Sequence, residues 1–173
     1  METKRQKQKV IAKYHHTGRG IVTGRLENNP VSINCNIYVL ESGESATVFK
    51  LKRWHEGHAM MAHGGITASV LDEVMGYSNH AREYVEHLKY TPVFTGTVTY
   101  KYIRPVMVGE EYHAVGRIDS IEGRKRFITG EIMTPDGEVC VIGEGVFLTA
   151  KELEDSNEHV AFEPLSESDP KEI

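Results

Sequence analysis

Apolar and polar residues alternate with the period of a β-strand along the second half of the chain. The alternation is clear over 97–103, and 112–121, 126–133 and 139–148 follow as three more strand-like stretches. A period of two places one face of each stretch on a core and the other toward solvent. Asp136-Gly137, between the last two stretches, is a strong signal for a tight hairpin. We therefore expect an antiparallel meander in this half.

An earlier pair of stretches predicts a first hairpin. Residues 33–40 and 46–51 have strand-like composition and flank the turn-forming segment 41–45. Between this hairpin and the meander, the pattern changes to that of a helix. Its apolar positions cover about 200° of arc, which is wider than the stripe of a helix lying on one face of a core. These positions are Ile66, Ala68, Val70, Leu71, Val74 and Met75.

The order of hairpin, buried helix and meander predicts an α+β fold with a sheet around one central helix. The helical spacing continues after Gly76 through Tyr77, Ala81, Tyr84, Val85 and Leu88. We keep two interpretations of this continuation. It either extends the packing of the core or forms a wall of a ligand pocket.

Composition limits the number of domains but does not indicate a function. With 173 residues, 39% hydrophobic and 26% charged, the chain fits one globular domain. We divide it into an N-terminal extension at 1–30, a folded domain at 31–150 and an acidic tail at 151–173. The basic start over 1–13 and the acidic tail are expected to be mobile or loosely packed.

Charge and hydropathy argue against two classes of partner. The net charge of −5 disfavours nucleic acid as the main partner. No stretch has the apolar length of a membrane span, and the first residues lack the apolar core of a signal peptide, so we expect a cytoplasmic protein.

Cys35 and Cys140 stand alone in strand-like surroundings and are expected to be reduced core residues.

The start of the helix carries the chemistry. His63-Gly64-Gly65 precedes the apolar run, and a helix N-terminus offers unpaired N–H groups to negative charge. Asp72 follows eight residues after Gly64, which separates the two along a straight helix by about 12 Å. Groups that act on one atom must lie within roughly 3 Å of it. If both act on one ligand, the amide and the carboxylate come from different protomers about a two-fold axis.

Three motifs resemble those of a known family. They are His63-Gly64-Gly65, the helical run Leu71-Asp72-Glu73-Val74-Met75-Gly76 and the strand end Tyr100-Lys101-Tyr102-Ile103-Arg104-Pro105. Over residues 31–149 the chain resembles the hotdog-fold acyl-CoA thioesterases of the phenylacetic-acid (PaaI-like) type. The resemblance implies hydrolysis of an acyl-CoA thioester to a free acid and coenzyme A, without a cofactor. It also implies a homodimer or homotetramer with active sites at the dimer interface.

The resemblance assigns roles to positions of this chain. Gly64 would supply the oxyanion hole, Asp72 the catalytic carboxylate of the partner subunit, and Thr95 the hydroxyl that assists it. His63 shapes the turn and hydrogen-bonds the substrate. Asp72 acts either as general base or as nucleophile, and Glu73 is the next candidate for the acid. Some branches carry an asparagine that positions water where this chain has Gly57.

Substrate contacts are expected from two further groups. Gly65 allows close approach of backbone to substrate, and His58 or His55 is near enough in sequence to touch substrate or water. Basic side chains near strand ends would bind the phosphates of coenzyme A. Those proposed are Lys101, Arg104, Arg124 and Lys125. A metal site built on the neighbouring histidines is not expected, because their spacing matches no zinc motif.

Two other functions stay open. The first is a non-catalytic hotdog protein that binds acyl thioesters for carriage or regulation. It has no need of a carboxylate buried beside the cleft, which is costly without a partner. The second, a lyase or dehydratase on the same fold, is disfavoured because the chain lacks an Asp/His pair with the expected spacing.

Overall fold

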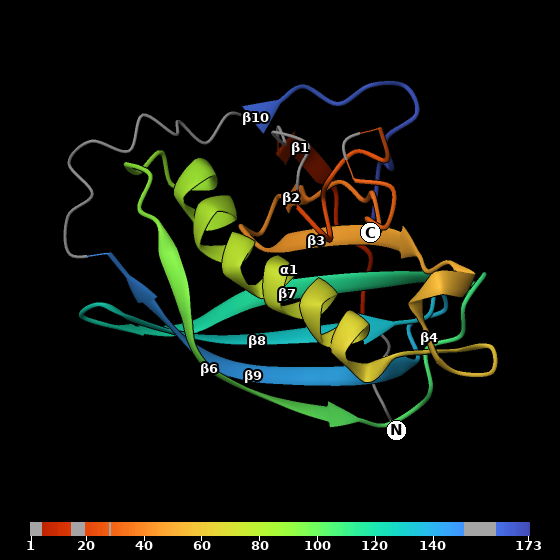
Figure 1. Cartoon of the computed structure of the whole chain (residues 1–173). Helices are drawn as coiled ribbons and strands as arrows, with labels where there is room; N and C mark the ends of the chain where they lie inside the picture. Colours follow the sequence, from red (N-terminus) through yellow and green to blue (C-terminus); the bar gives the residue numbers. More distant parts are fainter. Residues whose placement is uncertain (1–4, 15–19, 28, 151–161) are drawn as a thin grey trace.

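One long helix lies on one face of a large antiparallel sheet (Figure 1). The computed structural model describes residues 5–14, 20–27, 29–150 and 162–173. The sheet has eight strands in the order β10-β1-β2-β3-β7-β8-β9-β6. Their bounds are β1 Val10–Tyr14, β2 Tyr38–Leu40, β3 Ser45–Lys50, β6 Val93–Tyr102, β7 Glu111–Glu122, β8 Lys125–Met133, β9 Val139–Thr149 and β10 Phe162–Glu163. This architecture confirms the predicted α+β hotdog fold.

The helix, α1, spans Gly64–Val85. It begins where His63 acts as N-cap, and it ends before His87, whose positive φ of 54° does not fit a helix. The helical spacing predicted after Gly76 is confirmed as far as Val85, where it continues α1 rather than starting a second helix, and Leu88 lies beyond the helix end. The centre of its apolar face is fully buried, since Val70, Leu71, Val74 and Met75 are all 0% exposed, whereas Ile66 and Ala68 at its start are half-buried.

A row of glycines lets α1 approach the sheet closely. Gly116 pairs with Gly130, and Gly130 with Gly143, across the neighbouring strands β7, β8 and β9. A Cβ at Gly130 would lie 2.8 Å from Cδ1 of Leu71, and one at Gly116 would lie 2.9 Å from Cα of Met75. Side chains at these three positions would force the helix away, because protein interiors hold little spare volume. The row thereby fixes the height of α1, and of Asp72 on it, above the sheet.

The predicted meander is confirmed for its last three strands, but its first strand, predicted over 97–103, is wrongly placed, because β6 lies at the sheet edge beside β9 and not next to β7. Strands β7, β8 and β9 pair in sequence, and β6 pairs with β9. The first hairpin is also confirmed, since β2 pairs with β3. The predicted strand over 33–40 is correct only from Tyr38 onward. Asn34 has a φ of 59°, which interrupts an extended strand, and Ile33 and Cys35 instead bond to the backbone of 21–22.

Both ends of the described chain are packed more firmly than expected. The mobile start predicted for 1–13 is wrong at its end, because β1 pairs with β2. The loosely packed tail predicted from Lys151 is wrong for 162–173, because β10 pairs with β1 and Ile173 is only 5% exposed. Asp169 explains part of this firm packing. It accepts hydrogen bonds from Lys13 Nζ (2.9 Å) and Tyr38 Oη (3.0 Å), and its hydrogen-bond donors lower the pKa of its carboxyl group. Residues 151–161 lie outside the described part.

Cys35 and Cys140 are both buried and unpaired, as predicted. Burial raises the pKa of the Cys35 thiol to about 11, so the thiolate is absent at neutral pH.

A second small sheet, of β4 (Glu56–His58) and β5 (Met61–Ala62), precedes α1. None of the helices in the described residues is long and apolar enough to cross a membrane.

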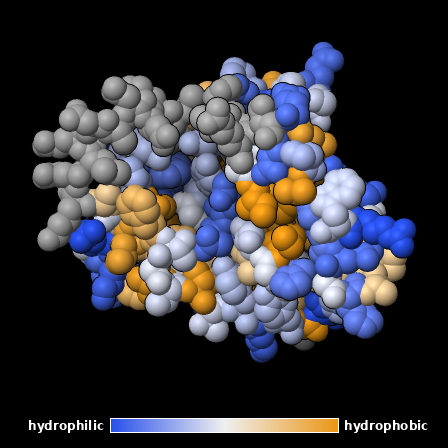
Figure 2. All heavy atoms as spheres, viewed as in Figure 1, coloured by the Kyte–Doolittle hydropathy of each residue, from blue (hydrophilic) through white to orange (hydrophobic). Residues whose placement is uncertain are grey.

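Strand β6 forms one edge of the main sheet and is largely exposed. It pairs with β9 on one side only. Phe94 and Tyr102, near its two ends, are 56% and 52% exposed, and Ile103 beyond it is 46% exposed. Figure 2 shows that apolar areas alternate with polar ones on the face that carries α1. A long bare edge with apolar side chains is a ready surface for pairing with another strand.

Candidate functional site

In the first turn of α1, one backbone amide has no partner within the described part of the chain. The N-cap His63 accepts a hydrogen bond from the Gly65 N–H through Nδ1 (3.0 Å). The N–H groups of Ile66 and Thr67 bond to the His63 carbonyl. Gly64 N–H has no hydrogen bond to any residue that the structure describes. Of the two glycines, it is therefore Gly64 that offers an amide to a ligand.

Tyr102 supports this turn from strand β6. Its hydroxyl donates to the carbonyl oxygen of Gly64 at 2.8 Å, and Thr67 Oγ1 donates to the same oxygen at 2.8 Å. A cavity of about 300 Å³ lies beside them, lined also by Arg104. Tyr102 belongs to one of the motifs used above, but its support of the turn was not predicted. Only the pairing of β6 in the sheet brings it to the helix start.

The second part of the site lies further along α1. Thr95 Oγ1 donates to the carboxylate of Asp72, at 3.0 Å from Oδ1 and 3.2 Å from Oδ2. A bulge in β6 at Gly96 breaks the register between Thr95 and Thr97. A Cβ at Gly96 would lie 2.8 Å from the Val146 carbonyl oxygen, so only glycine fits there. The bulge re-aims Thr95 toward the helix, which is a common use of bulges near active sites.

Asp72 and Glu73 both line a cavity of about 210 Å³ with Thr95. Burial raises the pKa of Asp72, and the hydrogen bond from Thr95 acts in the opposite direction. Burial also raises the pKa of Glu73, together with the charge of Asp72, while Thr23 lowers it through a hydrogen bond. A carboxylate with a raised pKa is a better proton acceptor, so either group suits a general base. The structure therefore leaves Glu73 as the alternative acid.

The amide and the acid lie in different cavities of the same chain. The cavity at Gly64 and the cavity at Asp72 share no lining residue. Both residues belong to α1, and eight residues of helix separate them by about 12 Å. One chain thus brings Asp72 together with Thr95, and Gly64 with Tyr102, but not the two pairs with each other.

Of the histidines before the helix, His55 serves the fold, and His58 is exposed. His55 is 3% exposed, with Nδ1 accepting from Lys52 N–H and Nε2 close to the Val31 carbonyl. His58 is exposed on β4. Gly57 lies so close to His63 that a Cβ would be 2.8 Å from its Cα, and this contact leaves no room for an asparagine side chain. Among the described residues no three potential ligands form a metal site.

The structure divides the four basic candidates between the two ends of α1. Lys101 and Arg104 lie at the end that holds Gly64, where Arg104 Nη1 donates to the Val139 carbonyl at 3.1 Å. Arg124 and Lys125 lie at the opposite end. Arg124 is engaged there, with Nε and Nη2 donating to the Thr149 carbonyl at 2.9 and 2.8 Å.

Comparison with known proteins agrees with the geometry. Residues 60–141 match the model of the thioesterase superfamily, and they hold the helix start, Asp72, Thr95 and most of the meander. The resemblance to hotdog-fold thioesterases is thereby confirmed at the level of the superfamily. None of the curated proteins matches the chain.

Solved structures with the same fold are numerous. The thioesterase superfamily protein RHA08564 is 29% identical, with a TM-score of 0.65 over 75% of this chain and 59% of that protein. The PaaI protein from the phenylacetic acid degradation operon of E. coli is 14% identical, with a TM-score of 0.61 over 72% and 86% of the two chains. A Bacillus halodurans protein solved with CoA is 25% identical, with a TM-score of 0.51 over 61% and 66%.

Proposed function

We propose that the chain is an acyl-CoA thioesterase of the PaaI-like type, which hydrolyses an acyl-CoA thioester to a free acid and coenzyme A. The observation that carries this proposal is the hydrogen-bonded pair of Asp72 and Thr95 in a cavity, on the same helix whose first amide, at Gly64, is unbonded among the described residues. These are the parts that ester hydrolysis needs: an acid to activate water or attack the carbonyl, and a donor for the oxyanion.

The amide of Gly64 would stabilise the tetrahedral intermediate. Thioester hydrolysis places negative charge on the former carbonyl oxygen, and one positioned donor contributes about 3 kcal/mol to its stabilisation. The N-terminus of α1 adds a favourable dipole at that position. His63 fixes the turn as N-cap, so its Nδ1 is occupied by Gly65 N–H and does not act as the base. The Gly65 amide is engaged for the same reason, and Gly65 would contact substrate through its Cα.

A two-fold dimer through β6 would complete two equivalent sites. Thr95 lies near the start of β6 and Tyr102 at its end. Antiparallel pairing of two β6 edges brings the start of one strand to the end of the other. The Asp72–Thr95 pair of one protomer then meets the Gly64–Tyr102 pair of its partner. The basic residues Arg124 and Lys125 would likewise approach the partner's end that carries Lys101 and Arg104. We propose this homodimer, alone or doubled into a tetramer, as the active form.

Residues 31–150 are proposed as the catalytic domain, with 1–30 and 151–173 as extensions on either side. The alternative function, a non-catalytic acyl-thioester binder, would use the same cleft without turnover. The raised pKa of Asp72 favours the enzyme, because even the partial burial of this carboxylate costs free energy that a binder has no reason to retain.

A panel of acyl-CoA thioesters tests the proposal. We expect release of free thiol from at least one aliphatic or aromatic acyl-CoA, followed with a chromogenic thiol reagent, with saturation in substrate. Tight binding of one thioester without release, measured by calorimetry, would instead support the non-catalytic binder. If no thioester of the panel is either hydrolysed or bound, both functions are contradicted.

The Thr95→Ala substitution is expected to lower kcat about tenfold, with KM changed less. The lost hydroxyl positions Asp72 and holds the pKa of its carboxyl group down. A general base works only when it is deprotonated, so kcat falls at pH values below the pKa of that base. Removal of Thr95 raises that pKa further, and the acid limb of the kcat profile should move to higher pH. A Thr95→Ser control retains the hydroxyl and should keep the wild-type limb. Unchanged kcat and an unchanged limb in Thr95→Ala would remove Thr95 from the site.

A further inference from the structure

The cavity that holds Asp72 runs along α1 toward its C-terminal end. Asp72, Gly76 and His80 all line it and follow one another at intervals of four residues, which places them on one side of the helix. Gly76 between them has no side chain, and a Cβ there would meet only Phe147, at 3.7 Å. The space beside Gly76 is therefore open, and His80 is the next side chain that an extended group leaving Asp72 would meet.

The imidazole of His80 is held firmly in this place. It is 7% exposed, and its Nδ1 lies 3.3 Å from Oε2 of Glu83. Its ring packs between two tyrosines, with centroid distances of 4.4 Å to Tyr90 and 5.6 Å to Tyr77. Glu83 is fixed in turn by hydrogen bonds from Asn79 Nδ2 (2.9 Å) and Thr91 N–H (3.2 Å). A ring with such neighbours does not move aside easily.

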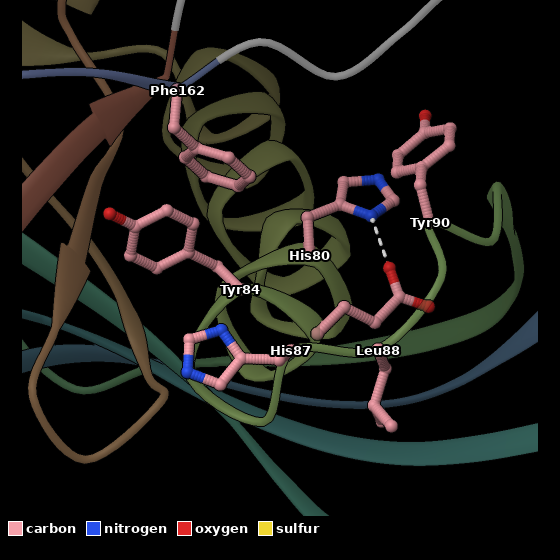
Figure 3. Close-up of a pocket in the computed structure, with 7 residues that line it drawn as sticks. His80, Tyr84, His87, Leu88, Tyr90 and Phe162 are labelled. Atoms are coloured by element: carbon pink, nitrogen blue, oxygen red, sulfur yellow. Dashed lines mark hydrogen bonds and ion pairs between the residues drawn. The ribbon is translucent and has the colours of Figure 1, made fainter.

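A second cavity, of about 310 Å³, lies beyond His80 (Figure 3). His80 and Tyr90 stand at one side of it, and Tyr84 and Phe162 form the other, with ring centroids 4.6 Å apart. Phe162 comes from β10, outside the region that matches the superfamily model. His80 lines this cavity as well as the one at Asp72, so its imidazole lies at the boundary of the two spaces.

We propose that His80 is the end wall of the acyl pocket and sets the longest acyl chain that the site accepts. The inference rests on the proposed function, since it assumes that the acyl group occupies the cavity at Asp72. From Asp72 to His80 the helix rises about 12 Å. An extended alkyl chain is a zigzag, so each C–C bond of about 1.5 Å advances it by only about 1.25 Å, and about ten carbons span that length. The site therefore takes short and medium acyl groups, and the cavity beyond His80 stays out of their reach.

The test is a series of straight-chain acyl-CoA thioesters that increase in length two carbons at a time. We expect kcat/KM of the wild-type dimer to fall sharply at about ten carbons. His80→Ala joins the two cavities, and it should raise kcat/KM about tenfold or more for the first chains beyond that limit, with little change for shorter ones. A methylene that a pocket has no room for changes specificity by about tenfold or more.

Two further variants separate volume from hydrogen bonding. His80→Phe keeps a ring of similar size without a bond to Glu83, and it should keep the wild-type length limit. His80→Asn is smaller but keeps a donor toward Glu83, and it should extend the limit as His80→Ala does, even if the alanine variant folds poorly. Thermal unfolding verifies that each variant is folded, and size-exclusion chromatography verifies that it is a dimer.

Three results would overturn the inference, and they differ from one another. The same length limit in the wild type, His80→Ala and His80→Asn would show that His80 is not the end wall. A change by one common factor at every length would show that the pantetheine arm, rather than the acyl chain, occupies this cavity. If the wild type hydrolyses no acyl-CoA of any length, the proposed function fails, and the inference fails with it.

Discussion

Asp72→Asn is expected to lower kcat for acyl-CoA hydrolysis by about a thousandfold. Asparagine has almost the same shape and keeps an oxygen for the hydrogen bond from Thr95, but it neither accepts a proton nor attacks a carbonyl. The variant should fold and assemble as the wild type does, because the carboxylate contributes little to packing on α1. Steady-state kinetics with the best substrate of the panel, together with size-exclusion chromatography, measures both expectations.

Glu73→Gln is the matched control for this substitution. Glu73 is adjacent on α1, lines the same cavity and also has a raised pKa. We expect it to change kcat by less than about tenfold, since no described hydroxyl on β6 orients it as Thr95 orients Asp72. Near-normal turnover in Asp72→Asn with a large loss in Glu73→Gln would transfer the catalytic role to Glu73. Near-normal turnover in both would contradict a carboxylate mechanism at this cavity.

Gly64→Pro is expected to lower kcat by about 10² to 10³-fold, the usual loss when one oxyanion donor is removed. Proline lacks the N–H group that we assign to the oxyanion. The first helical position is also the one where proline is best tolerated, and the extended backbone of His63 before it (φ −62°, ψ 132°) suits a residue that precedes proline. The helix should therefore form normally, and the loss should appear in kcat rather than in stability.

Gly64→Ala is the corresponding control, because it adds a side chain but keeps the N–H. A Cβ at this position would lie 3.5 Å from the ring of Tyr102, an ordinary contact. We expect turnover within a few fold of the wild type. If the alanine variant loses as much activity as the proline variant, steric disturbance of the turn explains both, and the amide has no special role.

The sequence predicted the elements that carry regular patterns. The arc of apolar residues from Ile66 to Met75 predicted a buried helix, and the structure buries Val70 and Met75 completely. The alternation over 112–148 predicted three strands within about one residue of their observed ends. The spacing of Gly64 and Asp72 along one helix also predicted that a single chain does not bring them together, and the two separate cavities agree with this.

Features that depend on strand register could not be predicted in this way. The glycines at 116, 130 and 143 are far apart in sequence and form a row only because β7, β8 and β9 pair with one particular register. The bulge at Gly96 that turns Thr95 toward Asp72 is equally a matter of pairing. A glycine within a strand pattern was the available signal for that bulge. The resemblance to a family placed Thr95 in the site without explaining how it gets there.

Long-range contacts also explain the errors at the ends of the chain. The composition of 162–173 is acidic and polar, which by itself predicts a loose tail. Asp169 instead accepts hydrogen bonds from Lys13 and Tyr38, and Ile173 packs in an apolar cluster with Val10. The same packing carries Phe162 to the end of α1, where it lines the cavity beyond His80. Local composition contains no information on such partners.

The claim that the active site is shared between protomers has one direct test. The Asp72→Asn and Gly64→Pro variants, each nearly inactive alone, are mixed in equal amounts and allowed to exchange subunits. In a random mixture half of the dimers are hybrids, and each hybrid has one site with an intact Asp72 and an intact Gly64 from different chains. We predict that activity returns to about a quarter of the wild-type value. No recovery in a mixture whose hybrids are verified by mass spectrometry would contradict the shared site.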